Sequence, residues 1–263
     1  MINKTIGNGG DYATIGDAIA ALNAASPLTD DYTFTLISDV AEEWHVSLNY
    51  DANGKTVTFT AAPHGGLLAS AKKVTLSTPD SGLDFHIANG NLIFENIHVY
   101  RTDTTYNHYT MRLNVVNSGS IILRKCFIYT GVAGGVCACG TSGSTKIYGC
   151  LLYGSIYGGS RALTLSGSNA VVENVTIFSC VYGVFDPTGN DAAVLRNVAT
   201  LDCPTGWYIF GGGSAALINC ADSGTTINDS LHRTNCLSGV DTVSNMWSII
   251  PTDPRFMVPR IQL

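Results

Sequence analysis

The sequence has few charged residues and no long hydrophobic run. Charged residues make up 13% of the 263 residues, about half the usual share. The net charge of −6 argues against the basic surface that a phosphate backbone requires, so no nucleic-acid partner is expected. No apolar stretch approaches the roughly 18 residues of a membrane span, and residues 1–12 contain no apolar signal region. The sequence therefore predicts a soluble protein that is made in a cytosol and has no membrane partner.

Metal-binding motifs are scarce as well. Cys137 and Cys139 form a CxC pair, but neither a CxxC pair nor a nearby histidine completes a site, so no metal ion or other cofactor is expected. Cysteines recur at equivalent positions of successive repeats in two pairs, Cys126 with Cys150 and Cys180 with Cys203. Buried, reduced thiols are the favoured interpretation of these columns. Bridging within a stacked pair remains the alternative, because neighbouring strands lie near disulfide range.

The sequence does contain a ladder of similar segments in its middle. They occupy residues 91–100, 120–129, 144–153, 169–178, 191–201 and 214–223. In each segment, one apolar residue follows a corner position whose residue varies, and we call these apolar residues the pin column. They recur at intervals of 29, 24, 25, 23 and 22 residues. The pin residues are Ile97, Cys126, Cys150, Val175, Val198 and Cys220. Self-similarity at this period in strand-type sequence predicts a solenoid of stacked strands.

A second apolar column follows the pin column three residues later. It consists of Tyr100, Tyr129, Tyr153, Phe178 and Leu201, and we call it the aromatic column. Both columns are predicted to lie in the core, with the rings stacked on one another. At the corner before the pins, a partial asparagine ladder is predicted from Asn96, Asn174, Asn197 and Asn219, interrupted by Lys125 and Gly149. Glu173 and Arg196, on adjacent coils, are predicted to form a surface ion pair.

One helix is predicted near the N-terminus. Apolar residues recur at helical spacing over residues 15–22, with Thr14 as N-cap and Asp17 completing a capping box. Residues 7–22, GNGGDYATIGDAIAAL, resemble the opening of the pectin-lyase-like superfamily, which includes pectin esterases and bacteriophage tailspike and fibre proteins. The resemblance implies an all-β fold, a single-stranded right-handed parallel β-helix with a short N-terminal capping helix.

The chain is predicted to form one domain with three parts. Residues 1–31 form the N-terminal cap, residues 32–243 the β-helix coils, and residues 244–263 a closing segment. The last of these contains the Asp-Pro-x-Phe string that often ends coils in the superfamily. The longest interval of the ladder contains the loop 101–110, where a function is expected because loops on a rigid scaffold carry most binding sites.

The catalytic strings of the superfamily's carbohydrate-active members are missing from the sequence. The nearest match to the pectin esterase string is YGVFDPTG (182–189), which lacks the flanking residues. No string typical of polygalacturonases or pectate lyases is present. No catalytic residue of the superfamily can therefore be assigned here, and enzyme activity is not expected.

Weaker catalytic candidates come from the residues themselves. Asp84 and His86 alternate onto one face of a strand, while Asp103, Tyr106 and His108 share the long loop. Asp84 and Asp103 on neighbouring coils would supply the two carboxylates that glycoside cleavage requires. The favoured alternative is that Asp84 and His86 are solvated strand residues and that the loop is a polar contact surface.

Three functions are compatible with these observations. The first is a structural virion component of a bacteriophage, a capsid decoration, tail or fibre protein made in the host cytoplasm. Its partners would be other virion proteins and itself, and the resemblance implies a homotrimer. The second is a carbohydrate-active enzyme, such as a tailspike depolymerase or a pectin-degrading protein. The third is a module that binds a surface glycan through the 101–110 loop.

Overall fold

The structure is a computed structural model. It describes residues 1–43, 45–62, 72–78, 81–102, 109–130, 134–140, 143–154, 160–166, 169–186, 192–209, 215–222, 225–227, 232–234 and 236. Asp103, His108 and the closing segment 244–263 lie outside the described residues. The described part contains one helix, α1 (Ile15–Ala24), and no helix in it is long and apolar enough to cross a membrane.

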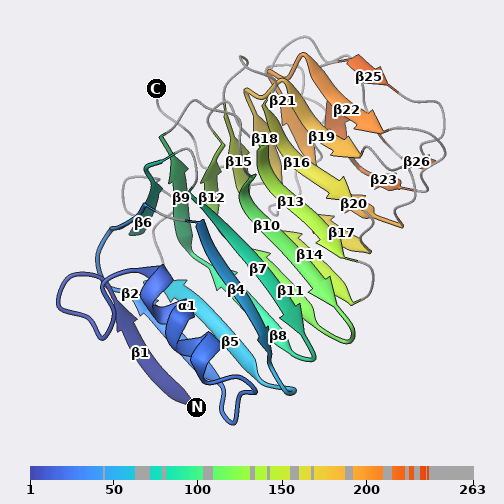
Figure 1. The fold of residues 1–263 in the computed structure, drawn as a ribbon. Helices are drawn as coiled ribbons and strands as arrows, with labels where there is room; N and C mark the ends of the chain where they lie inside the picture. The colour runs from blue at the N-terminus through green and yellow to red at the C-terminus, as the bar shows by residue number, and fades with distance from the viewer. Residues whose placement is uncertain are drawn as a thin grey trace.

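The strands form three parallel sheets, named A, B and C (Figure 1). Sheet A contains, in spatial order, β1 (Ile2–Ile6), β2 (Tyr32–Leu36), β5 (Thr56–Ala61), β8 (Asn91–Glu95), β11 (Ser120–Arg124), β14 (Ser144–Tyr148), β17 (Ala170–Glu173), β20 (Val194–Arg196), β23 (Ala216–Ile218) and β26 (His232–Thr234). Sheet B contains β3 (Val40–Glu42), β6 (Lys72–Leu76), β9 (Ile97–Arg101), β12 (Phe127–Tyr129), β15 (Leu151–Tyr153), β18 (Thr176–Phe178), β21 (Ala199–Leu201) and β24 (Ala221–Asp222). Sheet C contains β4 (His45–Asp51), β7 (Gly82–Ala88), β10 (Tyr109–Val116), β13 (Gly134–Gly140), β16 (Arg161–Ser166), β19 (Tyr182–Asp186), β22 (Thr205–Ile209) and β25 (Thr225–Ile227).

Each turn of the coil takes one strand from each sheet in sequence order, as β11, β12 and β13 do. Neighbouring strands are parallel, so each residue stacks on its equivalent in the next turn. Alternate side chains point inward and form one continuous apolar core. The predicted all-β parallel β-helix with one short helix near the N-terminus is confirmed.

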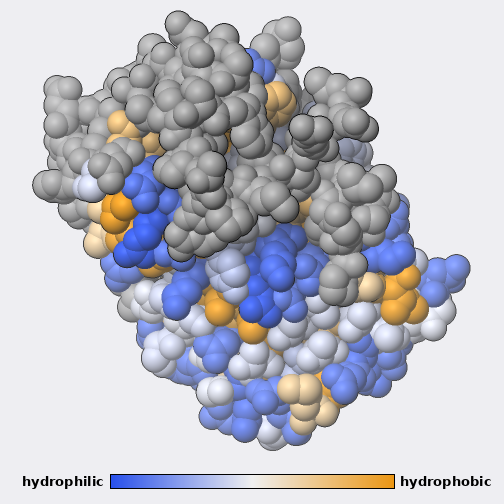
Figure 2. Space-filling model, turned by 180° about the vertical axis from the view of Figure 1, so that it is seen from behind, coloured by the Kyte–Doolittle hydropathy of each residue, from blue (hydrophilic) through white to orange (hydrophobic). Residues whose placement is uncertain are grey.

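The outer surface is mixed in polarity. Figure 2 shows the side opposite to that of Figure 1, where the described residues form small, separate hydrophobic patches among hydrophilic ones. Large hydrophobic side chains that are well exposed among the described residues are Met1, Ile37 and Phe178. The core, rather than the surface, therefore holds most of the apolar side chains of the described part.

The corner between sheets A and B has the same backbone conformation in six successive turns. The residue before each pin has a positive φ between 52° and 61°, and these residues are Asn96, Lys125, Gly149, Asn174, Asn197 and Asn219. Asparagine and glycine tolerate this left-handed region better than other residues. Asn197 donates to the Asn174 side-chain oxygen at 2.9 Å, and Asn219 donates to that of Asn197 at 3.4 Å. These bonds confirm the partial asparagine ladder.

Lys125 is the poorest fit to this corner, and replacing it should stabilise the coil. We expect Lys125→Asn to raise the free energy of unfolding by about 0.5–1 kcal/mol, because asparagine tolerates the left-handed conformation and can hydrogen-bond to Asn96. Chemical denaturation followed by circular dichroism measures the change. Lys146→Asn, on an exposed strand position of the next turn, is the matched control and should give no gain. Equal effects of the two substitutions would contradict the corner argument.

The pin column is buried as predicted, but the aromatic column is not in the core. The pin residues are 0–3% exposed. Tyr100, Tyr129 and Tyr153 are half-buried on the outer face of sheet B, and Phe178 is 36% exposed. The prediction of a core position was wrong because side chains alternate along a strand, so an offset of three residues from a pin reaches the opposite face.

The predicted ring stacking is present on this outer face. The rings of Tyr100 and Tyr129 are stacked with centroids 4.7 Å apart, and those of Tyr129 and Tyr153 are 5.1 Å apart at a tilt of 44°. His98 contacts the Tyr153 hydroxyl at 2.6 Å. Because ring faces point at one another along the coil, the column presents mainly ring edges and hydroxyls to solvent.

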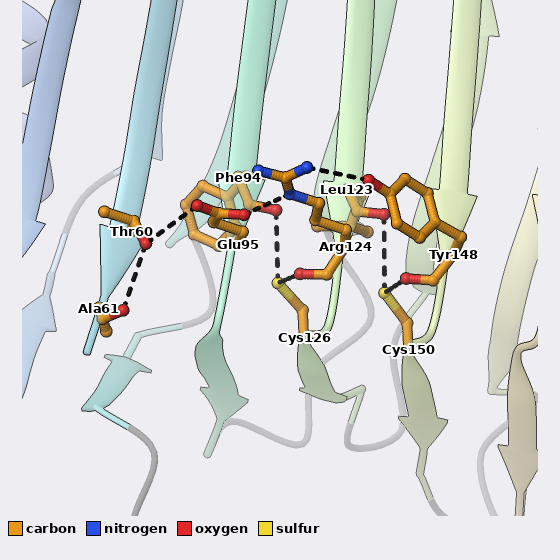
Figure 3. Close-up of polar contacts among 9 residues, drawn as sticks. All are labelled: Thr60, Ala61, Phe94, Glu95, Leu123, Arg124, Cys126, Tyr148 and Cys150. Atoms are coloured by element: carbon orange, nitrogen blue, oxygen red, sulfur yellow. Dashed lines mark hydrogen bonds and ion pairs between the residues drawn. The ribbon is translucent and has the colours of Figure 1, made fainter. Parts of the chain in front are cut away.

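Polar contacts connect adjacent turns on the outer face of sheet A. Glu95 pairs with Arg124, which also donates to the Tyr148 hydroxyl at 3.1 Å (Figure 3). The predicted pair of Glu173 with Arg196 is present at 2.6 Å. A parallel column of apolar or basic residues, Ile93, Ile122, Lys146, Val171 and Val194, runs beside these pairs.

All eight cysteines are free thiols. In the pin column, the Cys126 thiol donates to the Phe94 and Arg124 carbonyl oxygens, and Cys150 repeats the pattern one turn later (Figure 3). The favoured interpretation of these cysteines as small, buried packing residues agrees with this arrangement.

Helix α1 covers the N-terminal end of the coil (Figure 1). Its apolar stripe is buried, and Thr14 and Asp17 form the predicted capping box. In the last turn of the helix, the Asn23 side chain donates to the Ser47 carbonyl and accepts from the Asn49 amide. The two bonds satisfy backbone groups on the open edge of β4, the first strand of sheet C. The cap therefore covers an edge that could otherwise pair with a strand of another molecule.

Glu42 on β3 binds the N-terminal end of helix α1. It is 4% exposed, and its carboxyl accepts from the first helical amides, Ile15 at 2.6 Å and Gly16 at 3.3 Å. Burial raises the pKa of Glu42 to about 7 against the lowering effect of these two amides, and Asp17 adds to the rise. A titratable group therefore joins the helix to sheet B.

Candidate functional site

A cluster of polar side chains lies on the outer face of sheet C. On β7, Leu83, Phe85 and Ile87 point into the core, so Asp84 and His86 point outward. On β10, Arg112 lies beside Asp84 and Asn114 beside His86. On β13, Cys137 and Cys139 continue the same two rows. The site is thus built by the register of three neighbouring strands.

Asp84 is the centre of this cluster. It is only 6% exposed, and its carboxylate lies 3.0 Å from His86 Nε2 and 3.8 Å from a terminal nitrogen of Arg112. The Asn114 amide nitrogen donates to His86 Nδ1 at 2.8 Å. Since Nδ1 accepts this bond, Nε2 carries the ring proton and is the nitrogen that faces Asp84. A buried carboxylate is thereby held between an imidazole and a guanidinium, an arrangement common at acid–base and anion-binding sites.

The cluster also contains a thiol in contact with a cation. Arg112 Nε donates to the Cys139 sulfur at 3.3 Å. The pKa of Cys139 is lowered to about 6, mainly by a hydrogen bond from Cys137 and then by the hydrogen bond and the charge of Arg112. The shared hydrogen bond and burial raise the pKa of Cys137. The surroundings of the pair therefore favour the thiolate form of Cys139, the more exposed of the two.

Aromatic residues extend this face along the coil. Tyr109 packs over Gly134, where a Cβ atom would lie 2.5 Å from the ring. Further along, the Arg161 guanidinium lies 4.0 Å from the centre of the Phe185 ring, which stacks on Tyr208 with centroids 5.0 Å apart. The outer face of sheet C thus combines charged groups at one end with a cation–aromatic surface at the other.

Asp84 and His86 meet here, and the three candidates on the long loop, Asp103, Tyr106 and His108, cannot be placed. Asp84 and His86 lie 3.0 Å apart, although Asp84 is buried rather than solvated. Asp103 and His108 lie outside the described residues, so the proposed Asp84–Asp103 pair stays a prediction. Within the described part, no group of three or more histidine, cysteine or acidic residues is arranged to hold a metal ion.

Sequence reasoning missed Arg112, Asn114 and the role of Cys139. Arg112 lies 28 residues after Asp84 and 27 before Cys139, close to the ladder intervals of 22–29 residues. These separations could have indicated that the three residues are neighbours, because residues one period apart in a parallel coil lie side by side.

No protein-family model matches the sequence, and no curated protein matches it. Two solved structures are similar, both of the pectin methylesterase from Aspergillus niger, one in a penultimately deglycosylated form and one in a deglycosylated form. Each is 14% identical in sequence and covers 88% of both chains, with TM-scores of 0.45 and 0.43. The fold assignment rests on the strand pairings described above.

Proposed function

We propose that the chain is a structural component of a bacteriophage particle, a capsid decoration, tail or fibre protein. The observation that supports this proposal is the continuous three-sheet coil, closed at its N-terminal end by α1 and Asn23. A closed end opposes strand-to-strand polymerisation, while the side faces remain available for packing. A rigid rod of this kind suits a particle that has to persist outside a cell.

Self-association through the outer face of sheet A is part of this proposal. The half-buried apolar residues Ile93, Ile122, Val171 and Val194 lie in one column, in which the exposed Lys146 stands between Ile122 and Val171. Beside it run ion pairs within the chain, which leave few unpaired charges to desolvate. Three copies packed side by side, with other virion proteins as further partners, would cover this face.

The test is to look for the chain in phage particles. Particles are purified by density gradient from lysates of the host that carries the gene, and their proteins are identified by mass spectrometry. We expect the chain at a fixed copy number per particle, and a trimer mass for the purified chain by light scattering. Abundance in the lysate without enrichment in particles would overturn the proposal.

A second candidate function is glycan binding or cleavage on the outer face of sheet C. The observation that favours it is the buried Asp84 carboxylate held by His86 and Arg112, on the same face as the surface made by Arg161 and Phe185 further along the coil. A carboxylate in this position can exchange a proton with a substrate through His86. The two arginines on this face are suited to the carboxylates of an acidic polysaccharide.

This second function predicts a large effect of one isosteric substitution. If the purified chain releases reducing or unsaturated ends from acidic or neutral polysaccharides, Asp84→Asn should lower the rate at least a hundredfold, because it removes the charge that orients His86 and Arg112. Glu173→Gln, which alters another Arg-paired carboxylate, is the matched control and should leave the rate unchanged. Release that is insensitive to Asp84→Asn would exclude this site.

A further inference from the structure

Cys137 and Cys139 differ from the other cysteines of the chain. Both point outward from β13, whereas the other six lie at or near the corner positions of the coil. Five of those six are at most 3% exposed. Their thiols donate to backbone carbonyls, and burial raises the pKa of Cys203 to about 11. Neutral, buried thiols of this kind are chemically inert.

The surroundings of Cys139 favour a reactive thiolate. Arg112 directs a charged N–H at the sulfur from 3.3 Å, and the Asp84 carboxylate lies on the other side of that guanidinium at 3.8 Å. Asp84 is in turn held by His86 at 3.0 Å. Arg112 is therefore fixed between two anionic positions. A thiolate beside a fixed cation and partly open to solvent is the usual setting of a nucleophilic cysteine.

We infer that Cys139 and Cys137 form a thiol–disulfide exchange site that accepts small disulfides such as oxidised glutathione. The Cys139 thiolate attacks one sulfur of the disulfide RSSR, the S–S bond breaks, and RS⁻ leaves and takes up a proton. The Cys137 thiol then loses its proton to water and attacks the Cys139 sulfur, releasing the second RS⁻. Two protein thiols are oxidised to one disulfide, and RSSR is reduced to two RSH.

The second step requires the strand to bend locally. Residues i and i+2 of a strand point to the same side with Cα atoms about 6.6 Å apart, and their Cβ atoms are about as far apart, whereas a disulfide needs Cβ atoms about 3.5–4.5 Å apart. Such a bridge is formed under strain and is easily reduced again. Cys137 is 3% exposed, so an incoming disulfide reaches Cys139 first. The pair thus has a distinct attacking thiol and a distinct resolving thiol.

The charged and titratable groups around Cys139 come from three strands. They are Cys137 on β13, Arg112 on β10, and Asp84 and His86 on β7, while β16 presents the uncharged Ser166 beside it. Tyr109 hydrogen-bonds to Cys137 rather than to Cys139. Arg112 is the permanent cation of this set, so together with the hydrogen bond from Cys137 it should set the pH at which Cys139 reacts.

The first experiment maps reactivity in the reduced, folded full-length chain. The chain is exposed to oxidised glutathione at pH 7, unreacted thiols are alkylated, and the products are identified by peptide mass spectrometry. We expect Cys139 to react at least tenfold faster than any other cysteine, and a Cys137–Cys139 disulfide to follow. A fastest thiol at any other position, including the half-buried Cys236, or the lack of that disulfide, would overturn the inference.

Variants separate the roles of the groups. Cys137→Ser should trap the glutathione adduct on Cys139, and Cys139→Ser should abolish the fast reaction. Arg112→Ala should slow the reaction about tenfold at pH 6 and move the midpoint of its pH profile upward, toward that of an ordinary thiol. Arg196→Ala is the matched control, because the Arg112 and Arg196 side chains are 47% and 46% exposed and both pair with a carboxylate. An unchanged pH profile in Arg112→Ala would overturn the assignment of Arg112.

Discussion

Replacing Phe59 with alanine is expected to lower the free energy of unfolding by about 3–5 kcal/mol. Phe59 is fully buried on β5. Its ring stacks on Phe34 with centroids 5.0 Å apart, and lies 6.2 Å from the ring of Phe94 and 6.4 Å from that of Phe85. The substitution therefore opens a cavity among three other rings, and closely packed turns cannot collapse to fill it without breaking their strand pairing.

Tyr129→Ala is the informative comparison for this prediction. Tyr129 also lies between two aromatic rings, but it is on the outer face of sheet B, where its removal leaves no internal cavity. We expect a loss of only about 1–2 kcal/mol, the value of two aromatic contacts. Urea denaturation followed by circular dichroism gives both values as shifts in midpoint. A loss for Tyr129→Ala as large as that for Phe59→Ala would contradict the assignment of the aromatic column to the surface.

The second large effect is a pH dependence of stability that arises from Glu42. The pKa of Glu42 is about 7 in the folded chain and about 4.3 in an unfolded one. Between these values the folded state binds more protons, so the free energy of unfolding decreases as pH rises. The stabilising contribution is complete below pH about 4.3 and is lost by pH about 7. Its size is about 3 kcal/mol, an order-of-magnitude value.

Glu42→Gln isolates this contribution. An amide oxygen can still accept from Ile15 and Gly16 but does not titrate over this range. We expect the variant to match the natural chain at pH 4 and to exceed its stability by about 3 kcal/mol at pH 8. Glu43→Gln, the exposed neighbour, is the control and should leave the pH curve of the natural chain unchanged. A constant difference between Glu42→Gln and the natural chain at all pH values would contradict the raised pKa.

Local sequence rules predicted much of the architecture. The apolar stripe and the Thr14–Asp17 capping box specify α1, because both depend on residues a few positions apart. The asparagines before the pins specify the left-handed corner, since few other residues tolerate that conformation. The sequence also contained the information that places the aromatic column. Side chains alternate between the two faces of a strand, and Tyr100 is three residues after the inward-pointing Ile97, so this rule places the aromatic column on the outer face.

The candidate site was predicted only in part. Asp84 and His86 are two residues apart, so their common face followed from the strand pattern. Arg112 and Cys139 join them from other turns, and their positions depend on the pairing of β7 with β10 and of β10 with β13. The intervals between successive pin residues vary from 22 to 29 residues, so spacing alone does not define which residues face each other on sheet C.

The sequence by itself determined the coil, its corners and the cap, because each arises from short-range patterns repeated in every turn. Only the tertiary structure decided that Asp84, Arg112 and Cys139 form one cluster, and that burial rather than solvent surrounds Asp84 and Glu42. The physical reason is that register and burial are properties of stacked turns. A carboxylate or thiol acquires its protonation behaviour from neighbours that are more than 20 residues away along the chain.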